Sequence, residues 1–235
     1  MGDISLAGNS NLLLLTEQLY KRFVADGYPG FLKMESAGTT AGVQAFCRND
    51  PAQPSVDIVA TTRLLWEEEL DRCLRLGRHP LALWVGLDAL VVVVPSSNNF
   101  VKDVSMSEVP ELFKVRRWSD VNSAWPRRGI TTVLPGQSSD DLALFVDLFF
   151  AGDLQRLLTK QDTFFTQDDI ETIQEILDNP DTIGVINYAS YLQNKEKLRL
   201  VKIANKAPDL ATLHAGEWPL SRPLLLYTTV ELLRS

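Results

Sequence analysis

Histidine and cysteine are scarce in this chain, which has two of each among 235 residues. No pair of these residues has the spacing of zinc ligands. The phosphate-loop pattern G-x-x-x-x-G-K-[ST] and the dinucleotide fingerprint G-x-G-x-x-G are both absent from the sequence. The turn from Gly136 to Asp140 has aspartate where the nucleophile elbow of a serine hydrolase needs its second glycine. The sequence therefore predicts no metal site, no cofactor and no enzymatic activity.

Blocks of basic residues and long apolar runs are also missing. Lys and Arg total 23 against 30 Asp and Glu, which gives a net charge of −7 and disfavours a general nucleic-acid surface. The longest apolar stretch, 81–94, is interrupted by Gly86 and Asp88 and is too short to span a membrane as a helix. No basic residue precedes Lys21, so the basic start of a secretory signal is missing and the chain is either cytosolic or without its leader. A small molecule or a protein is the expected partner, and nucleic acid is not.

The two cysteines, Cys47 and Cys73, do not indicate whether the protein is found in an oxidising or a reducing compartment. Both lie in segments with a helical pattern, and free cysteine is among the most frequently buried residue types. We therefore expect two buried free thiols, with a disulfide as the less favoured alternative.

Short apolar segments alternate with longer segments of helical period along the whole chain. Strands are expected at residues 4–6, 31–34, 56–60, 91–94, 130–134, 183–186 and 224–227. The run 91–94 is apolar at every position, which is typical of a strand buried on both faces. Leu12, Leu15, Leu19 and Phe23 have the spacing of one apolar helix face. This alternation predicts an α/β fold in which helices flank mixed sheets on both faces.

Four polar loops each follow an expected strand and precede an expected helix. In an open α/β sheet, ligands bind beyond the carboxyl ends of the strands, where helix N-termini offer free N–H groups to an anion. Ser, Thr and Asn side chains add further donors, although plain helix capping also explains any single loop of this composition. The candidate ligand residues are Asn9, Ser10 and Asn11 in the first loop, Ser36, Gly38, Thr39 and Thr40 in the second, Thr62 and Arg63 in the third, and Gln137, Ser138 and Ser139 in the fourth.

Arg63 is the one arginine in these four loops. It either faces the ligand as a cationic anchor or forms a surface ion pair with Glu67, four residues further along an expected helix. Both alternatives remain open at the level of sequence.

The order of these loops resembles the phosphate-binding proteins of bacterial phosphate ABC transporters. Gly8 to Asn11 stands where that family has a Gly-Ser-Ser-Thr turn, and Asp57 to Arg63 is similar to its D-I-x-x-A-S-R. Residues 178–186 are similar to the family's N-P-G-A-I-G-Y-V, and residues 216–224 to its G-x-Y-P-L-S-R-P-L. The resemblance extends through almost the whole chain.

The resemblance implies a type II periplasmic-binding-protein fold with two lobes and a ligand cleft. Lobe 1 is expected at residues 1–90 plus 216–235, and lobe 2 at residues 91–215. The implied function is non-catalytic capture of phosphate, or of another small anion or polar solute, by hinge closure. The implied setting is periplasmic or otherwise extracytoplasmic, with membrane transporter subunits or a fused or partner domain as possible partners.

The fourth loop departs from the family pattern. Where the family has an arginine, an acidic residue and G-S-G-T, residues 134–141 of this chain are Leu-Pro-Gly-Gln-Ser-Ser-Asp-Asp. The guanidinium that would clamp an oxyanion is missing, and Asp140 and Asp141 bring negative charge to the helix start. We expect phosphate binding about a hundredfold or more weaker than in a standard member. The alternative is an interaction or sensor module that keeps the fold but has lost phosphate binding.

The family's closing helices have no counterpart before Ser235. The chain is therefore expected to be a trimmed domain of a larger protein or a shortened variant.

Overall fold

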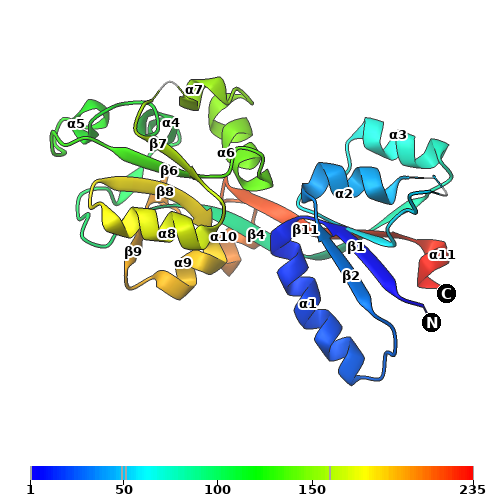
Figure 1. The fold of residues 1–235 in the computed structure, drawn as a ribbon. Helices are drawn as coiled ribbons and strands as arrows, with labels where there is room; N and C mark the ends of the chain where they lie inside the picture. Colours follow the sequence, from blue (N-terminus) through cyan, green and yellow to red (C-terminus); the bar gives the residue numbers. More distant parts are fainter. Residues whose placement is uncertain (1, 49, 51, 159, 235) are drawn as a thin grey trace. The chain divides into compact units, whose positions relative to one another are not determined.

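The computed structural model describes residues 2–48, 50, 52–158 and 160–234, and the side chain of the expected ligand residue Asn11 lies outside the described part. The chain divides into two compact units (Figure 1). Unit 1 comprises Met1–Leu87 and Arg222–Ser235, and unit 2 comprises Asp88–Ser221. The chain thus passes from one unit to the other twice.

Unit 1 is a mixed sheet with the strand order β2-β1-β3-β11. β1 pairs in parallel with both β2 and β3, and β11 pairs antiparallel with β3. The elements of this unit are β1 (Ile4–Gly8), α1 (Ser10–Ala25), β2 (Leu32–Ser36), α2 (Gly38–Phe46), β3 (Ile58–Thr61), α3 (Glu67–Arg75), the first half of β4 (Pro80–Pro95), most of β11 (Ser221–Thr229) and α11 (Val230–Leu233).

Helices cover both faces of the unit 1 sheet because successive strand residues point to opposite sides. Val59 packs in one buried cluster with residues of α2 and α3, whereas the next residue, Ala60, packs with Leu12 and Leu13 of α1. α1 is buried only near its start, since Leu15, Leu19 and Phe23 are 39%, 50% and 47% exposed. The apolar face predicted for α1 is therefore only partly covered.

The strands of unit 2 follow the order β4-β8-β6-β7, with β9 paired to β4, and their pairing is mixed. β6 is parallel to β7 and β8, and β4 is antiparallel to β8. The further elements of this unit are β5 (Asp103–Val104), α4 (Glu108–Leu112), α5 (Trp118–Val121), β6 (Thr131–Pro135), α6 (Asp140–Phe150), α7 (Gln155–Leu158), β7 (Thr163–Thr166), α8 (Asp169–Asp178), β8 (Thr182–Asn187), α9 (Tyr188–Asn194), β9 (Leu198–Leu200), β10 (Lys202–Ile203) and α10 (Leu210–His214).

β4 is much longer than the strand expected at residues 91–94. It begins at Pro80, and its residues 82–85 are exposed, whereas residues 91–94 are completely buried in the core of unit 2. The buried part was predicted correctly from its unbroken apolar run. Both units are mixed sheets flanked by helices, so the predicted α/β fold is confirmed.

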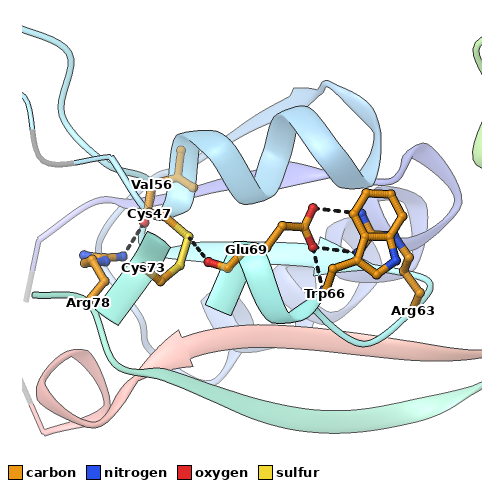
Figure 2. The surroundings of a disulfide bond; sticks show 7 residues. All are labelled: Cys47, Val56, Arg63, Trp66, Glu69, Cys73 and Arg78. Carbon is orange, nitrogen blue, oxygen red and sulfur yellow. Dashed lines mark hydrogen bonds and ion pairs between the residues drawn. A yellow bond between two sulfur atoms is a disulfide. The ribbon is translucent and has the colours of Figure 1, made fainter. Parts of the chain in front are cut away.

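Cys47 and Cys73 form a disulfide bond in unit 1 (Figure 2). Cys47 directly follows α2, Cys73 lies near the end of α3, and their Cα atoms are 4.5 Å apart. Free thiols were therefore the wrong expectation. α2 and α3 pack in the same cluster on one face of the sheet, and this tertiary contact between the helices is not visible in their separate helical patterns.

The disulfide is expected to stabilise unit 1 because it joins two residues that are 26 positions apart in the sequence, which restricts the conformations of the unfolded chain. Replacing both cysteines with alanine should lower the free energy of unfolding by about 3 kcal/mol in a urea titration. Reduction of the wild-type protein should give a similar loss, and reductant should leave the double variant unchanged. Equal unfolding midpoints for the oxidised wild type and the variant would contradict a stabilising role for the bond.

Candidate functional site

Three of the four polar loops meet at one edge of the unit 1 sheet. Because β1 is parallel to both neighbours, the carboxyl ends of β1, β2 and β3 lie at this same edge. Backbone hydrogen bonds connect the loops: the N–H of Asn9 donates to the carbonyl of Ala60 at 3.0 Å, and the N–H of Ala37 donates to the carbonyl of Gly8 at 3.2 Å.

Two glycines allow α2 to approach this edge closely. Gly8 has a φ of +137°, a conformation that glycine adopts without steric cost. A Cβ atom on Gly42 of α2 would lie only 2.8 Å from the Cα of Gly8, so any side chain there would push the helix away from β1. The start of α2 is held beside the first and third loops for this reason.

The expected ligand residues of unit 1 fall into a buried and an exposed group. Asn9, Thr39 and Thr62 are 4%, 1% and 6% exposed, and the hydroxyl oxygen of Thr39 accepts a hydrogen bond of 3.4 Å from the N–H of Thr62. The exposed residues Ser10, Ser36 and Thr40 lie beside them in the sequence, and Gly38 is the first residue of α2.

The N-terminus of α2 has no polar cap of its own. Its N-cap residue is Ala37, whose methyl group cannot accept a hydrogen bond from the first turn. The first N–H groups of a helix need an external partner, and an anion is a suitable one. Plain capping therefore does not explain the composition of the second loop.

Arg63 forms an ion pair, but with a different glutamate from the one considered in the sequence. Its Nη1 and Nη2 atoms lie 2.7 and 2.9 Å from the two carboxylate oxygens of Glu69, and its guanidinium stacks 3.5 Å from the ring centre of Trp66 (Figure 2). Pairing with Glu67 was the wrong expectation. Glu69 turns back to the start of α3, where it also accepts a 2.9 Å hydrogen bond from the N–H of Trp66.

The ionised form of Glu69 is favoured by these partners. Its partial burial opposes ionisation, but the hydrogen bonds from Arg63 and from the Trp66 N–H outweigh that effect and hold its pKa below the ordinary value. The carboxylate thus places a negative charge at the guanidinium of Arg63 at neutral pH.

The fourth loop lies in unit 2, between β6 and α6. Ser139 is the N-cap of α6, and its side-chain oxygen accepts a 3.1 Å hydrogen bond from the N–H of Leu142, so capping accounts for this residue. Gln137 and Ser138 are exposed. Pro135 is buried at the end of β6, where it contributes no N–H donor.

Asn187, which was not selected from the sequence, binds Asp141 at the start of α6 and also Asp169, a second residue that was not selected. The Nδ2 of Asn187 donates to Asp141 at 3.0 Å, and the N–H of Asn187 donates to Asp169 at 3.2 Å. Asn187 ends β8 and Asp169 begins α8. Both therefore lie where a strand ends or the next helix begins, which is the criterion that selected the four loops.

The carboxyl group of Asp169 is harder to ionise than an ordinary aspartate. Burial raises its pKa and the charge of Asp141 adds to this effect, while hydrogen bonds from Ser190 and Asn187 oppose it. Because the pKa is raised on folding, the contribution of Asp169 to stability is present in acid and is lost as the pH rises through the folded-state pKa.

Replacement of Asp141 by asparagine should lower the pKa of Asp169, because it removes the negative charge that opposes ionisation. The measurement is an NMR titration of the side-chain carboxyl carbons, in which Asp169 of the wild type should titrate above an ordinary aspartate. Asp147→Asn, an exposed change on the same helix, is the control. An unchanged midpoint for Asp169 in the Asp141 variant would contradict the coupling of the two carboxyl groups.

Comparison with known proteins places the chain among binding proteins. The family model of a PBP superfamily domain matches residues 1–230. The phosphate-binding protein PstS of Staphylococcus epidermidis is 27% identical over 235 residues, which cover 96% of this chain and 68% of that protein. PstS of Staphylococcus aureus is 26% identical over 242 residues, with coverage of 99% and 70%.

Solved structures that are similar to this chain are also described as phosphate-binding proteins. A possible phosphate binding protein from Planctomyces limnophilus has a TM-score of 0.72 and 27% identity, covering 99% of this chain and 83% of its own. An ABC-type phosphate transport receptor from Vibrio cholerae has a TM-score of 0.76 over 97% of this chain and 88% of its own, and its 18% identity supports the fold alone. The predicted resemblance and fold class are confirmed by these matches, and the chain belongs to the PBP superfamily.

Proposed function

We propose that the chain is a non-catalytic receptor that captures phosphate or another small oxyanion for an ABC transporter. The observation that carries this proposal is the meeting of three donor-rich loops at one edge of the unit 1 sheet, beside the start of α2, whose N-cap residue is Ala37. The relatives in Staphylococcus are phosphate-binding proteins by name, which supports the same ligand class. They give no support to an interaction module that has lost its ligand.

The proposed ligand residues are those selected from the sequence. In unit 1 they are Asn9, Ser10, Asn11, Ser36, Gly38, Thr39, Thr40, Thr62 and, through its backbone N–H and not its guanidinium, Arg63, and in unit 2 they are Gln137, Ser138 and Ser139. Most of these donors are neutral hydroxyl, amide or backbone groups, so the set relies on hydrogen bonds more than on net charge.

We also propose that units 1 and 2 are the two lobes of the receptor. The expected lobes, residues 1–90 with 216–235 and residues 91–215, have limits a few residues away from those of the compact units. The two passages of the chain between the units are the candidate hinge, and hinge closure around a ligand is a common motion of such proteins.

An extracytoplasmic location is part of the proposal. The disulfide between Cys47 and Cys73 supports an oxidising compartment. Within the part of the chain that the structure describes, no helix has the length and apolar character needed to cross a bilayer. Membrane transporter subunits are the proposed protein partners.

The proposal is tested by isothermal titration of the full chain with phosphate, using Thr40→Val and Thr40→Ser variants. Valine removes the exposed hydroxyl at the start of α2 and should weaken binding about tenfold or more, because a hydrogen bond to a charged ligand is lost. Serine keeps the hydroxyl and is the matched control. Equal affinities of the wild type and the valine variant would remove Thr40 from the site.

The same titration tests the effect of the altered fourth loop. The wild type should bind phosphate weakly, because Asp140 and Asp141 lie in the first turn of α6, where a helix otherwise attracts anions. A micromolar or tighter dissociation constant would show that the other loops suffice. Absence of binding for phosphate, sulfate and small carboxylates alike would contradict the receptor function.

A further inference from the structure

The guanidinium of Arg63 is fully engaged at its two terminal nitrogens. Nη1 donates to Glu69 and, at 3.1 Å, to the carbonyl of Leu64, while Nη2 donates to Glu69 and, at 3.3 Å, to the hydroxyl of Thr40. Each terminal nitrogen carries two hydrogens, so all four are used by groups of unit 1. No bidentate pair of terminal N–H groups is left for an anion that reaches this loop.

Glu69 is held firmly in its position opposite Arg63. Its own backbone carbonyl lies 4.0 Å from the Sγ of Cys47, and Cys73, one turn further along α3, is disulfide-bonded to Cys47 (Figure 2). Its carboxylate receives three hydrogen bonds, two from Arg63 and one from the N–H of Trp66. Side-chain exposure is 13% for Glu69 and 25% for Arg63, so the pair is partly shielded from solvent but not sealed.

The pair lies beside the donors of the proposed site. Thr40 belongs to the first turn of α2, and the preceding residue, Thr39, contacts the third loop through the N–H of Thr62. The carboxylate of Glu69 therefore takes the place on Arg63 that an oxyanion would otherwise take, since carboxylate and phosphate match the same fork of donors.

We propose that Glu69 is a specificity-determining residue that acts as an internal counter-anion. It neutralises Arg63 and leaves unit 1 with neutral donors, so that the site discriminates little between singly and doubly charged anions. Removal of the carboxylate charge releases the guanidinium, and the gain in binding is larger for a dianion than for a monoanion. The inference rests on the proposed function, which supplies the anion site in unit 1.

The test uses sulfate and nitrate as probes, because sulfate is a dianion and nitrate a monoanion at neutral pH. Isothermal titration is carried out on the full chain as wild type, Glu69→Gln, Glu67→Gln, Arg63→Gln and the double variant Arg63→Gln/Glu69→Gln. Glu67→Gln is the matched control, since it removes the same charge from an exposed position on the same helix. Circular dichroism melting confirms that each variant is folded.

Glu69→Gln should tighten sulfate binding about tenfold or more, as expected when a charged donor pair becomes available, and should change nitrate binding much less. Glu67→Gln should leave both affinities close to the wild type. The double variant should lose the gain, which would assign it to Arg63. Arg63→Gln alone should weaken sulfate binding, because it leaves the Glu69 carboxylate uncompensated beside the site, whereas the double variant, which lacks both charges, should bind sulfate about as the wild type does.

Three outcomes would overturn the proposal. If the wild type binds sulfate or phosphate and Glu69→Gln binds them no better, Glu69 is a structural partner of Arg63 and the receptor function stands. If the double variant binds sulfate about tenfold less tightly than the wild type, Arg63 contacts the anion in spite of Glu69, and this comparison remains decisive even where Glu69→Gln alone fails to fold. If neither the wild type nor Glu69→Gln binds any of the anions, both the proposal and the receptor function are wrong.

Discussion

The parallel pairing of β1 with both of its neighbours is the constraint on which the candidate site of unit 1 depends. Parallel strands end at the same edge of a sheet, so the loops that follow β1, β2 and β3 converge without any contact between their side chains being required. Gly8 and Gly42 then allow α2 to come close to β1, which brings Thr39 beside Thr62. The hydroxyl and amide groups of the loops owe their proximity to this backbone geometry.

Charged side chains near the candidate loops are held by partners within their own unit. In unit 1, Arg63 is paired with Glu69, and in unit 2, Asn187 links Asp141 to the carboxyl group of Asp169. The chain as a whole carries a net charge of −7. A receptor of the proposed kind would bind an anion mainly through helix N-termini and neutral donors, and the Arg63–Glu69 pair would influence its affinity.

Periodicity and turn composition were sufficient to predict the parts of the fold that depend on local sequence. The fully apolar run at residues 91–94 is a buried strand, and the loops selected as candidate sites follow β1, β2, β3 and β6. Contacts between elements could not be predicted in the same way. The disulfide and the link from Asn187 to Asp141 depend on how separate elements pack together in the fold. The choice of Glu69 over Glu67 depends on the residue at which α3 begins, because the Glu69 carboxylate turns back to the N–H of Trp66 at the helix start.

The most direct test of the account is an amide NMR titration of the full chain with phosphate. If the three loops share one anion, the backbone N–H signals of residues 9–10, 38–40 and 62–63 should shift together, and signals of residues 137–139 should shift in the same concentration range. Shifts confined to one loop, or to residues away from these loops, would contradict the claim that the converging loops form the binding site.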